Sequence, residues 1–130
     1  MITDYAARAE ALVGTRFRAQ GRGQGGLDCI GVVIAAFEIS KDEVRSDYPL
    51  RARDARELRE GLLRHFRPVG HAQMRAGDVL LLRPADHQLH LAVRTESGFV
   101  HAHAGLRRVV ETPGLPEWPL LGVYRKRRGC

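Results

Sequence analysis

The pattern of hydrophobic and polar residues changes about halfway along the chain. Before residue 67, apolar residues recur at helical spacing in three stretches, and beyond Pro68 they fall into the short runs and alternations typical of strands. The predicted helices are 4–13, 29–38 and 54–66. The expected strands are 77–84, 88–95, 98–104, 107–112 and 119–127. Two loops are predicted, the segment 14–26 with its five glycines and the polar segment 40–53.

Residues suited to capping flank the predicted helices. Thr3 is the expected N-cap of the first helix, which Gly14 would end, and Asp28 and Asp54 are the expected caps of the other two. The middle helix contains the run IGVVIAAF, which is apolar nearly all round, so we expect it to be central and buried. The third helix is expected to bury one face, made of Leu58, Leu62, Leu63 and Phe66.

The order of elements, helices first and then a run of strands, predicts the fold class. Short connections between the strands favour antiparallel hairpins. The chain is therefore expected to be a single α+β domain over residues 1–130, with N-terminal helices packed on an antiparallel sheet.

Composition and net charge narrow the classes of partner that this protein is expected to bind. The net charge of +6, from 21 Lys and Arg against 15 Asp and Glu, favours anionic partners. Aromatic residues make up 6% of the chain and are not interleaved with the basic ones, so nucleic-acid binding is not supported. No apolar run approaches the ~20 residues of a membrane span. The N-terminus lacks the pattern of a secretion signal, so we expect cytoplasmic synthesis.

Cys29 follows the glycine-rich loop in the stretch GGLDCIGVV and falls in the first turn of the middle helix. Helix N-termini stabilise a thiolate, which makes this cysteine a candidate nucleophile. Three other interpretations stay open: a small buried hydrophobe, a metal ligand, and a disulfide partner of Cys130.

A nucleophilic cysteine needs a histidine base within reach. His90 interrupts an apolar strand between Leu89 and Leu91, and His101 and His103 lie two apart on one face of the next strand. The three histidines can therefore cluster across the hairpin. Together with Cys29 they also form a possible zinc set, although no familiar metal-binding spacing accompanies them.

Several segments in order carry a resemblance to a known family. GTRF leads through the glycine-rich loop to LDCIG, with Phe17 twelve residues before Cys29, and RAGDVLLLRP and HLAVRTESGFVHA follow. In this order the chain resembles the NlpC/P60 cysteine peptidases, most of all the short cell-wall peptidases encoded among phage tail genes and gene-transfer-agent clusters. The resemblance covers most of the chain.

The resemblance implies the papain-like NlpC/P60 fold with a five- to six-stranded sheet, and hydrolysis of peptidoglycan stem peptides without a cofactor. Cys29 matches the nucleophile, His90 the base that would hold it as a thiolate, and His101 the residue that orients the base, with His103 as the alternative. The implied site of action is the cell wall, in association with phage-tail-like proteins or a virion.

The resemblance also implies a substrate-binding set, from which this chain departs in places. Asp28 matches an aspartate that reads the free amino end of a stem peptide. The family tyrosine is Phe17, and the amide of nearby Gln20 is a candidate substitute for its hydroxyl. The family serine after the cysteine is Ile30. These departures favour the main alternative, a catalytically inactive tail or assembly module, and another Cys–His activity on the same fold also stays open.

Overall fold

The computed structural model describes residues 4–23, 25–45 and 48–127. The helices are α1 (Tyr5–Glu10), α2 (Cys29–Ala36) and α3 (Arg56–His65), with two short 3-10 helices, η1 (Lys41–Glu43) and η2 (His71–Gln73). The strands are β1 (Arg22–Gly23), β2 (Gly26–Leu27), β3 (Phe66–Val69), β4 (Val79–Ala85), β5 (Gln88–Arg94), β6 (Gly98–His103), β7 (Arg108–Pro113) and β8 (Leu120–Lys126). The predicted α+β class is confirmed.

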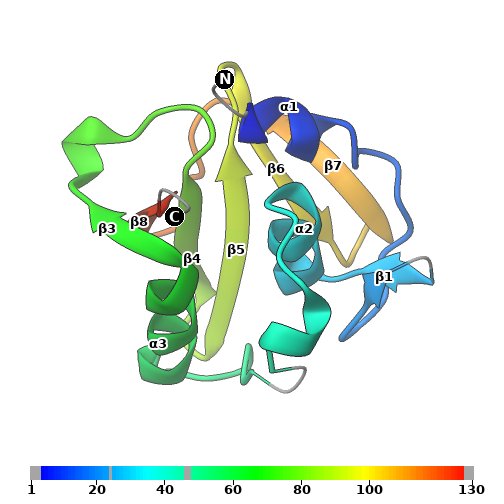
Figure 1. The fold of residues 1–130 in the computed structure, drawn as a ribbon, viewed down its shortest axis with the longest axis horizontal. Coiled ribbons are helices and arrows are strands. Elements are labelled where there is room, and N and C mark those ends of the chain that lie inside the picture. The colour runs from blue at the N-terminus through cyan, green and yellow to red at the C-terminus, as the bar shows by residue number, and fades with distance from the viewer. Residues whose placement is uncertain (1–3, 24, 46–47, 128–130) are drawn as a thin grey trace.

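One antiparallel sheet of six strands organises the molecule, in the order β3-β8-β4-β5-β6-β7. Figure 1 shows α2 and α3 in front of this sheet and α1 at its upper edge. The ladder between β5 and β6 consists of two pairs, Val93 with Val100 and Arg94 with Phe99. Beyond these pairs β5 and β6 are not paired with each other, and His90 and His101 lie in this part of the two strands.

The apolar run of α2 forms the centre of the main core, as predicted. Most of the helix is buried, and it packs on β5 and β6 and against α1. Asp28 caps the helix by accepting a hydrogen bond from the Gly31 backbone N–H at 2.7 Å. Gly31 is required here because a Cβ atom would lie 2.2 Å from the Gly21 carbonyl oxygen. The glycine-rich loop therefore lies directly against the start of α2.

The first helix differs from its prediction at both ends. Asp4 is the N-cap, and its side chain accepts a hydrogen bond from the Ala7 backbone at 2.9 Å. The predicted cap, Thr3, lies outside the described residues. The helix ends at Glu10, earlier than expected, because the chain then turns toward the sheet, where the Gly14 N–H donates to the Val109 carbonyl at 2.9 Å.

The third helix is shorter than predicted and buries a narrower face. It starts after Ala55, and Asp54 accepts a hydrogen bond from the Arg56 N–H at 2.8 Å. Leu63 is 41% exposed, so its predicted burial is wrong. Phe66 is buried as predicted but begins β3, because this segment pairs with β8 instead of continuing the helix.

All five predicted strands are present, and the sequence pattern missed three others. β3 contains Pro68 and reads as irregular, yet it forms an edge of the sheet beside β8. β1 and β2 form a small hairpin inside the segment predicted as a loop. At the centre of the sheet, the Asp78 carboxylate before β4 receives two hydrogen bonds of 2.8 Å from Arg125 of β8.

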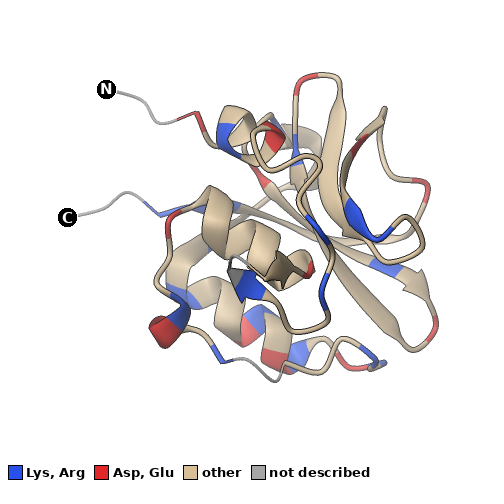
Figure 2. Ribbon diagram, turned by 90° about the vertical axis from the view of Figure 1, so that its right-hand side faces the viewer, with Lys and Arg blue, Asp and Glu red and all other residues tan. Residues whose placement is uncertain are grey.

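The charged residues are spread over the molecule. Figure 2 shows basic and acidic residues alternating over helices, strands and loops. Within the described chain, no helix has the length and apolar character needed to cross a membrane. Within the described residues, the expected preference for anionic partners therefore does not come from one strongly basic helix or strand.

Candidate active site

A cleft of about 730 Å³ brings the predicted site residues together. It lies between the start of α2, the glycine-rich loop and the ends of β5 and β6. All six predicted site residues line it: Phe17, Gln20, Asp28, Cys29, His90 and His101. Trp118, Arg22 and Arg51 also line it.

Cys29 is the first residue of α2 and is 3% exposed. Burial raises the pKa of its thiol from the usual 9.0 to about 12, and the Asp28 carboxylate raises it as well. Hydrogen bonds from the backbone of Leu91 and Ile30 and the charge of Arg22 lower it, but by less. The position in the helix was predicted correctly, whereas the expected low pKa is wrong because burial outweighs the helix N-terminus.

The hydrogen bond from Leu91 follows from the way the sheet opens. Leu91 lies in β5 beyond the two residue pairs that join this strand to β6. Its N–H is therefore not used in that ladder and donates to the Cys29 sulfur. The residue before it in the chain is His90, so the nucleophile candidate is bound to the backbone next to the base candidate.

His90 and His101 form a hydrogen-bonded pair. The His90 Nε2 and His101 Nδ1 atoms are 2.9 Å apart, and the rings meet edge to face with centroids 5.0 Å apart. Alternation along β5 puts Leu89 and Leu91 in the main core and His90 on the opposite face, so His90 does not point at the body of α2. The pair closes the part of the cleft where β5 and β6 separate.

Both histidines are neutral at pH 7. Burial, and after it the nearby His101 and His103, together lower the pKa of His90 to about 3. Burial and the charge of His103 lower the pKa of His101 to about 4. The free site therefore holds a thiol and neutral imidazoles, and the expected preformed thiolate is not its resting state.

His103, the alternative orienting residue, has a different partner. Its Nδ1 accepts a hydrogen bond from the Leu106 backbone N–H at 3.0 Å. Its ring lies 5.8 Å from that of His101, so the two histidines share a face as predicted. Of the two candidates, His101 is the one that contacts His90.

Asp28 caps α2 and also binds Arg22. Its Oδ1 atom accepts both the Gly31 N–H and the Arg22 Nη1, the latter at 2.6 Å. Both side chains of this ion pair are at most 10% exposed. The predicted capping role of Asp28 is confirmed, and the assignment to a substrate amine stays a prediction.

Phe17 and Gln20 approach the cleft from the glycine-rich loop. The chain bridges Phe17 to Leu27 of β2, and Gln20 adopts a left-handed conformation with φ of 58°. The chain turns at Gln20, and the loop then passes the N-terminus of α2. Arg22 gave no sequence signal because it was one of many arginines in a segment predicted to be irregular.

Trp118 is the other residue that sequence reasoning missed. It lies in the loop between β7 and β8, half-buried, with its ring 5.7 Å from that of His90 and 5.9 Å from that of His101. Its being the only tryptophan, in a proline-rich stretch before a strand, was the available signal. The ring covers the histidine pair on the side away from α2.

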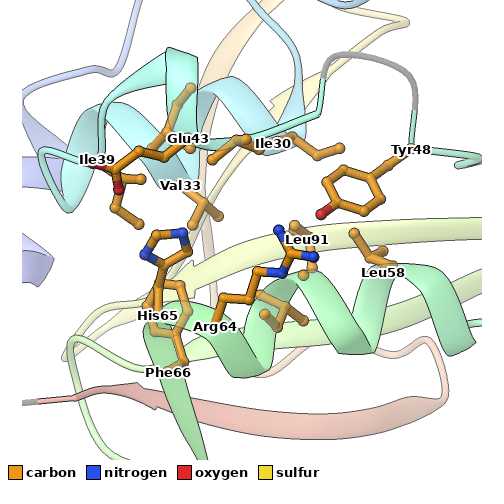
Figure 3. A pocket seen from close by; sticks show the side chains of 14 residues that line it. Ile30, Val33, Ile39, Glu43, Tyr48, Leu58, Arg64, His65, Phe66 and Leu91 are labelled. Atoms are coloured by element: carbon orange, nitrogen blue, oxygen red, sulfur yellow. The ribbon is translucent and has the colours of Figure 1, made fainter.

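A second, apolar pocket separates α2 from η1 and α3. Figure 3 shows Ile30 and Val33 opposite Leu58 and Phe66, with Tyr48 at one end. Its volume of about 30 Å³ gives room for little more than a water molecule. We regard it as imperfect packing beside the cleft.

Metal and disulfide chemistry were the other interpretations of the cysteine. Within the described ranges, no group of three or more His, Cys, Asp or Glu side chains is arranged to hold a metal ion. Cys29 is a free thiol, and its predicted alternative partner, Cys130, lies outside the described residues.

Solved structures similar to this chain have the NlpC/P60 fold. NlpC1 from Trichomonas vaginalis matches with a TM-score of 0.67 and 16% identity, over 94% of this chain and 42% of that protein. The NlpC/p60 domain of the peptidoglycan hydrolase SagA matches with a TM-score of 0.60 and 18% identity, over 85% and 86% of the two chains. The chain thus spans less than half of the Trichomonas protein.

RipD from Mycobacterium tuberculosis, described as a non-catalytic NlpC/p60 domain protein adapted to peptidoglycan binding, is similar as well. Its TM-score is 0.60 at 14% identity, over 95% of this chain and 94% of that one. No family model and no curated protein matches the sequence. At these identities the likeness establishes the fold, and the similar structures include a peptidoglycan hydrolase and a non-catalytic protein.

Proposed function

We propose that this protein is a cysteine peptidase that hydrolyses peptide bonds in peptidoglycan stem peptides. In this proposal Cys29 is the nucleophile, His90 the general base and acid, and His101 the residue that orients His90. The observation that carries it is the 2.9 Å hydrogen bond between His90 and His101 in a cleft that Cys29 also lines. Covalent catalysis uses a base that a second polar group orients and that can reach the nucleophile, and here the three side chains line one cleft.

The free site holds a neutral thiol and neutral imidazoles, and these protonation states determine how the first step can proceed. A thiol with a pKa of about 12 does not ionise by itself at pH 7. The proton therefore moves from the sulfur to His90 as the sulfur attacks the amide carbonyl, so that charge is created only along the reaction. Backbone N–H groups at the start of α2, including that of Cys29, receive the developing oxyanion.

The remaining steps return the enzyme to its starting state. The tetrahedral intermediate collapses, the C–N bond breaks, and His90 gives its proton to the leaving amine. A water molecule then loses a proton to His90 and attacks the thioester. The C–S bond breaks, the proton returns to the Cys29 sulfur, and the product leaves with a free carboxyl group.

Substrate recognition is part of the same proposal. The expected bond joins D-glutamate to a diamino acid, with Asp28, Gln20 and Phe17 on the substrate side of the cleft. Two arginines, Arg22 and Arg51, also line the cleft, and the net charge of +6 favours anionic peptides and wall polymers. Added salt should therefore weaken binding to cell walls more than it slows cleavage of a small peptide.

Digestion of purified peptidoglycan tests the proposal. Wild type should release stem-peptide fragments that mass spectrometry identifies, and Cys29→Ala should release none. His71→Gln, which changes an exposed histidine of η2, is the matched control and should match wild type. Equal fragment release by wild type and Cys29→Ala would contradict the proposal.

A second candidate function is a catalytically inactive peptidoglycan-binding module. The burial of Cys29 and its raised thiol pKa favour it, and RipD is an example among similar folds. Such a module would pellet with insoluble peptidoglycan, equally well as wild type and as Cys29→Ala, and would release no fragments. The digestion and a pelleting assay together separate the two candidates.

We also propose that the protein is synthesised in the cytoplasm, assembles with phage-tail-like proteins and acts at the cell wall. The support is the sequence resemblance to short tail-encoded peptidases. Mass spectrometry of purified tail-like particles from the source cells should find this chain at a fixed ratio to the tail proteins. Its recovery only in the soluble fraction would contradict this assignment.

A further inference from the structure

The histidine pair extends to a third side chain. Thr112 lies in β7, opposite Phe99 of β6, so its side chain shares a face with His101 two residues along β6. The His101 Nε2 and Thr112 Oγ1 atoms are 3.1 Å apart. His90, His101 and Thr112 therefore form one hydrogen-bonded chain that runs from the cleft across the sheet.

Both nitrogens of His101 are engaged in this chain. The side chain is buried, with an exposed fraction of 2% for the residue, so its polar atoms need partners inside the protein. Nδ1 faces His90 and Nε2 faces Thr112. A neutral imidazole has one N–H and one lone pair, so the direction of one hydrogen bond sets that of the other.

Two arrangements of protons satisfy the chain, and they differ in what they leave on His90. If Thr112 accepts from His101 Nε2, then His101 Nδ1 accepts from His90 Nε2, and the His90 Nδ1 atom keeps its lone pair. If Thr112 donates instead, each proton shifts to the other nitrogen, and His90 carries its proton on Nδ1. Only the first arrangement leaves His90 able to take a proton through Nδ1.

The first arrangement also suits both states of the base. When His90 gains a proton on Nδ1, its Nε2–H keeps donating to His101, and neither hydrogen bond in the chain has to reverse. The second arrangement would require both to reverse before His90 could act. A site in which no group reorganises during reaction has the lower barrier.

We propose that Thr112 is a positioning residue whose hydroxyl, by accepting from His101 Nε2, fixes the tautomers of His101 and His90. This inference rests on the proposed function for its catalytic consequence, in which the Cys29 S–H bond breaks and the proton goes to His90 Nδ1. Thr112 itself gains and loses no proton in that step. The tautomers can be observed without any activity.

The test compares three variants with wild type. Thr112→Val keeps the shape and removes the hydroxyl, Thr112→Ser keeps the hydroxyl, and Thr95→Val is the matched control. The Thr95 hydroxyl is also buried, in the turn between β5 and β6, but it binds Glu111 and the Gly98 N–H. Long-range ¹H–¹⁵N correlation spectra report which ring nitrogen carries the proton, with signals assigned from His90→Gln and His101→Gln.

Wild type, Thr112→Ser and Thr95→Val should have both rings protonated on Nε2. Thr112→Val should move both protons to Nδ1, because His101 then finds a partner for its N–H only at His90. For stem-peptide cleavage, we expect kcat to fall between about 10- and 100-fold in Thr112→Val with KM unchanged, and Thr112→Ser to restore it. Thr95→Val should leave kcat unchanged.

Identical tautomers in wild type and Thr112→Val would overturn the inference, whatever the activity. Wild-type rings protonated on Nδ1 would overturn it as well. A tautomer change in a wild-type protein that cleaves no peptide would support the role of Thr112 and count against the proposed peptidase. The two ideas can therefore fail separately.

Discussion

The two walls of the cleft hold their polar groups in different ways. The sheet wall carries His90 and His101, and the hydrogen-bonded chain that they form continues to Thr112, which lies outside the cleft lining. The helix wall carries Cys29, whose sulfur receives backbone hydrogen bonds but is held neutral by burial. The candidate base is thus positioned by other side chains, and the candidate nucleophile by backbone groups.

This difference indicates where the reaction has to supply energy. Burial raises the cost of placing a proton on His90 as well as the cost of ionising Cys29, so in the proposed mechanism the proton transfer has to be coupled to attack on the substrate. A buried neutral thiol is also less open to stray oxidants and electrophiles than an exposed thiolate. The predictions below separate the contributions of the two walls.

The largest expected effect follows from removing the base. His90→Gln should lower kcat/KM for stem-peptide cleavage by about 10²- to 10⁴-fold, because general base and acid catalysis are lost together. His103→Gln is the matched control, since His103 binds the Leu106 backbone and not His90. Steady-state kinetics on a synthetic stem peptide measures both, and equal losses in the two variants would contradict the assignment.

The next effect concerns the helix wall. Arg22→Met removes one partner of a buried ion pair and leaves the Asp28 carboxylate with the Gly31 N–H. The free energy of unfolding should fall by about 3 kcal/mol, measured by urea denaturation. Arg18→Met, an exposed arginine of the same loop, should change it by less than about 0.5 kcal/mol.

Thiol reactivity measures the state of the nucleophile directly. With a pKa of about 12, Cys29 should react with iodoacetamide at pH 8 about 30-fold more slowly than a model thiol, because the loss of thiolate outweighs its greater nucleophilicity. The same protein unfolded in urea is the control and should react at the model rate. A folded protein that reacts faster than the model thiol would show that the thiolate is preformed.

The sheet wall should also make the stability of the folded protein sensitive to acid. The pKa values of His90 and His101 fall to about 3 and about 4 in the folded protein, from an ordinary value of 6.5. The unfolded chain therefore binds more protons below pH 6.5, and stability is full above that pH and falls as the pH drops toward 3. Each histidine should contribute a slope of up to about 1.4 kcal/mol per pH unit.

Urea denaturation between pH 7 and pH 3.5 checks this slope. The double variant His90→Gln, His101→Gln should flatten it, while His71→Gln, which changes an exposed histidine, should leave it as in wild type. An unchanged slope in the double variant would mean that other groups govern the acid sensitivity.

Much of the fold was readable from the sequence. The alternation in 77–127 predicted all five strands of that region, and the apolar run after Asp28 predicted a buried central helix with its cap. The failures were at segments whose conformation depends on distant partners. β3 contains a proline and forms because it pairs with β8, and Leu63 is exposed although its helical spacing predicted burial.

The residues of the candidate site could likewise be predicted from the sequence, whereas their pKa values could not. Residue types and spacing identified Cys29, His90 and His101, all of which line one cleft. Arg22 and Thr112 gave no local signal, because each acts on a residue from another element, and the only signal at Trp118 was its being the single tryptophan of the chain. The family resemblance already favoured His101 over His103, and His101 is the one that contacts His90 in the structure.

The sequence by itself determined which groups this protein has and which helix or strand carries each, because periodicity and capping are local properties of the chain. Only the tertiary structure decided how those groups ionise and which nitrogen faces which partner. Burial, neighbouring charges and the parting of β5 from β6 set these properties, and all three arise from segments that are far apart in the sequence. A pKa is a property of the surroundings, and the surroundings exist only once the chain has folded.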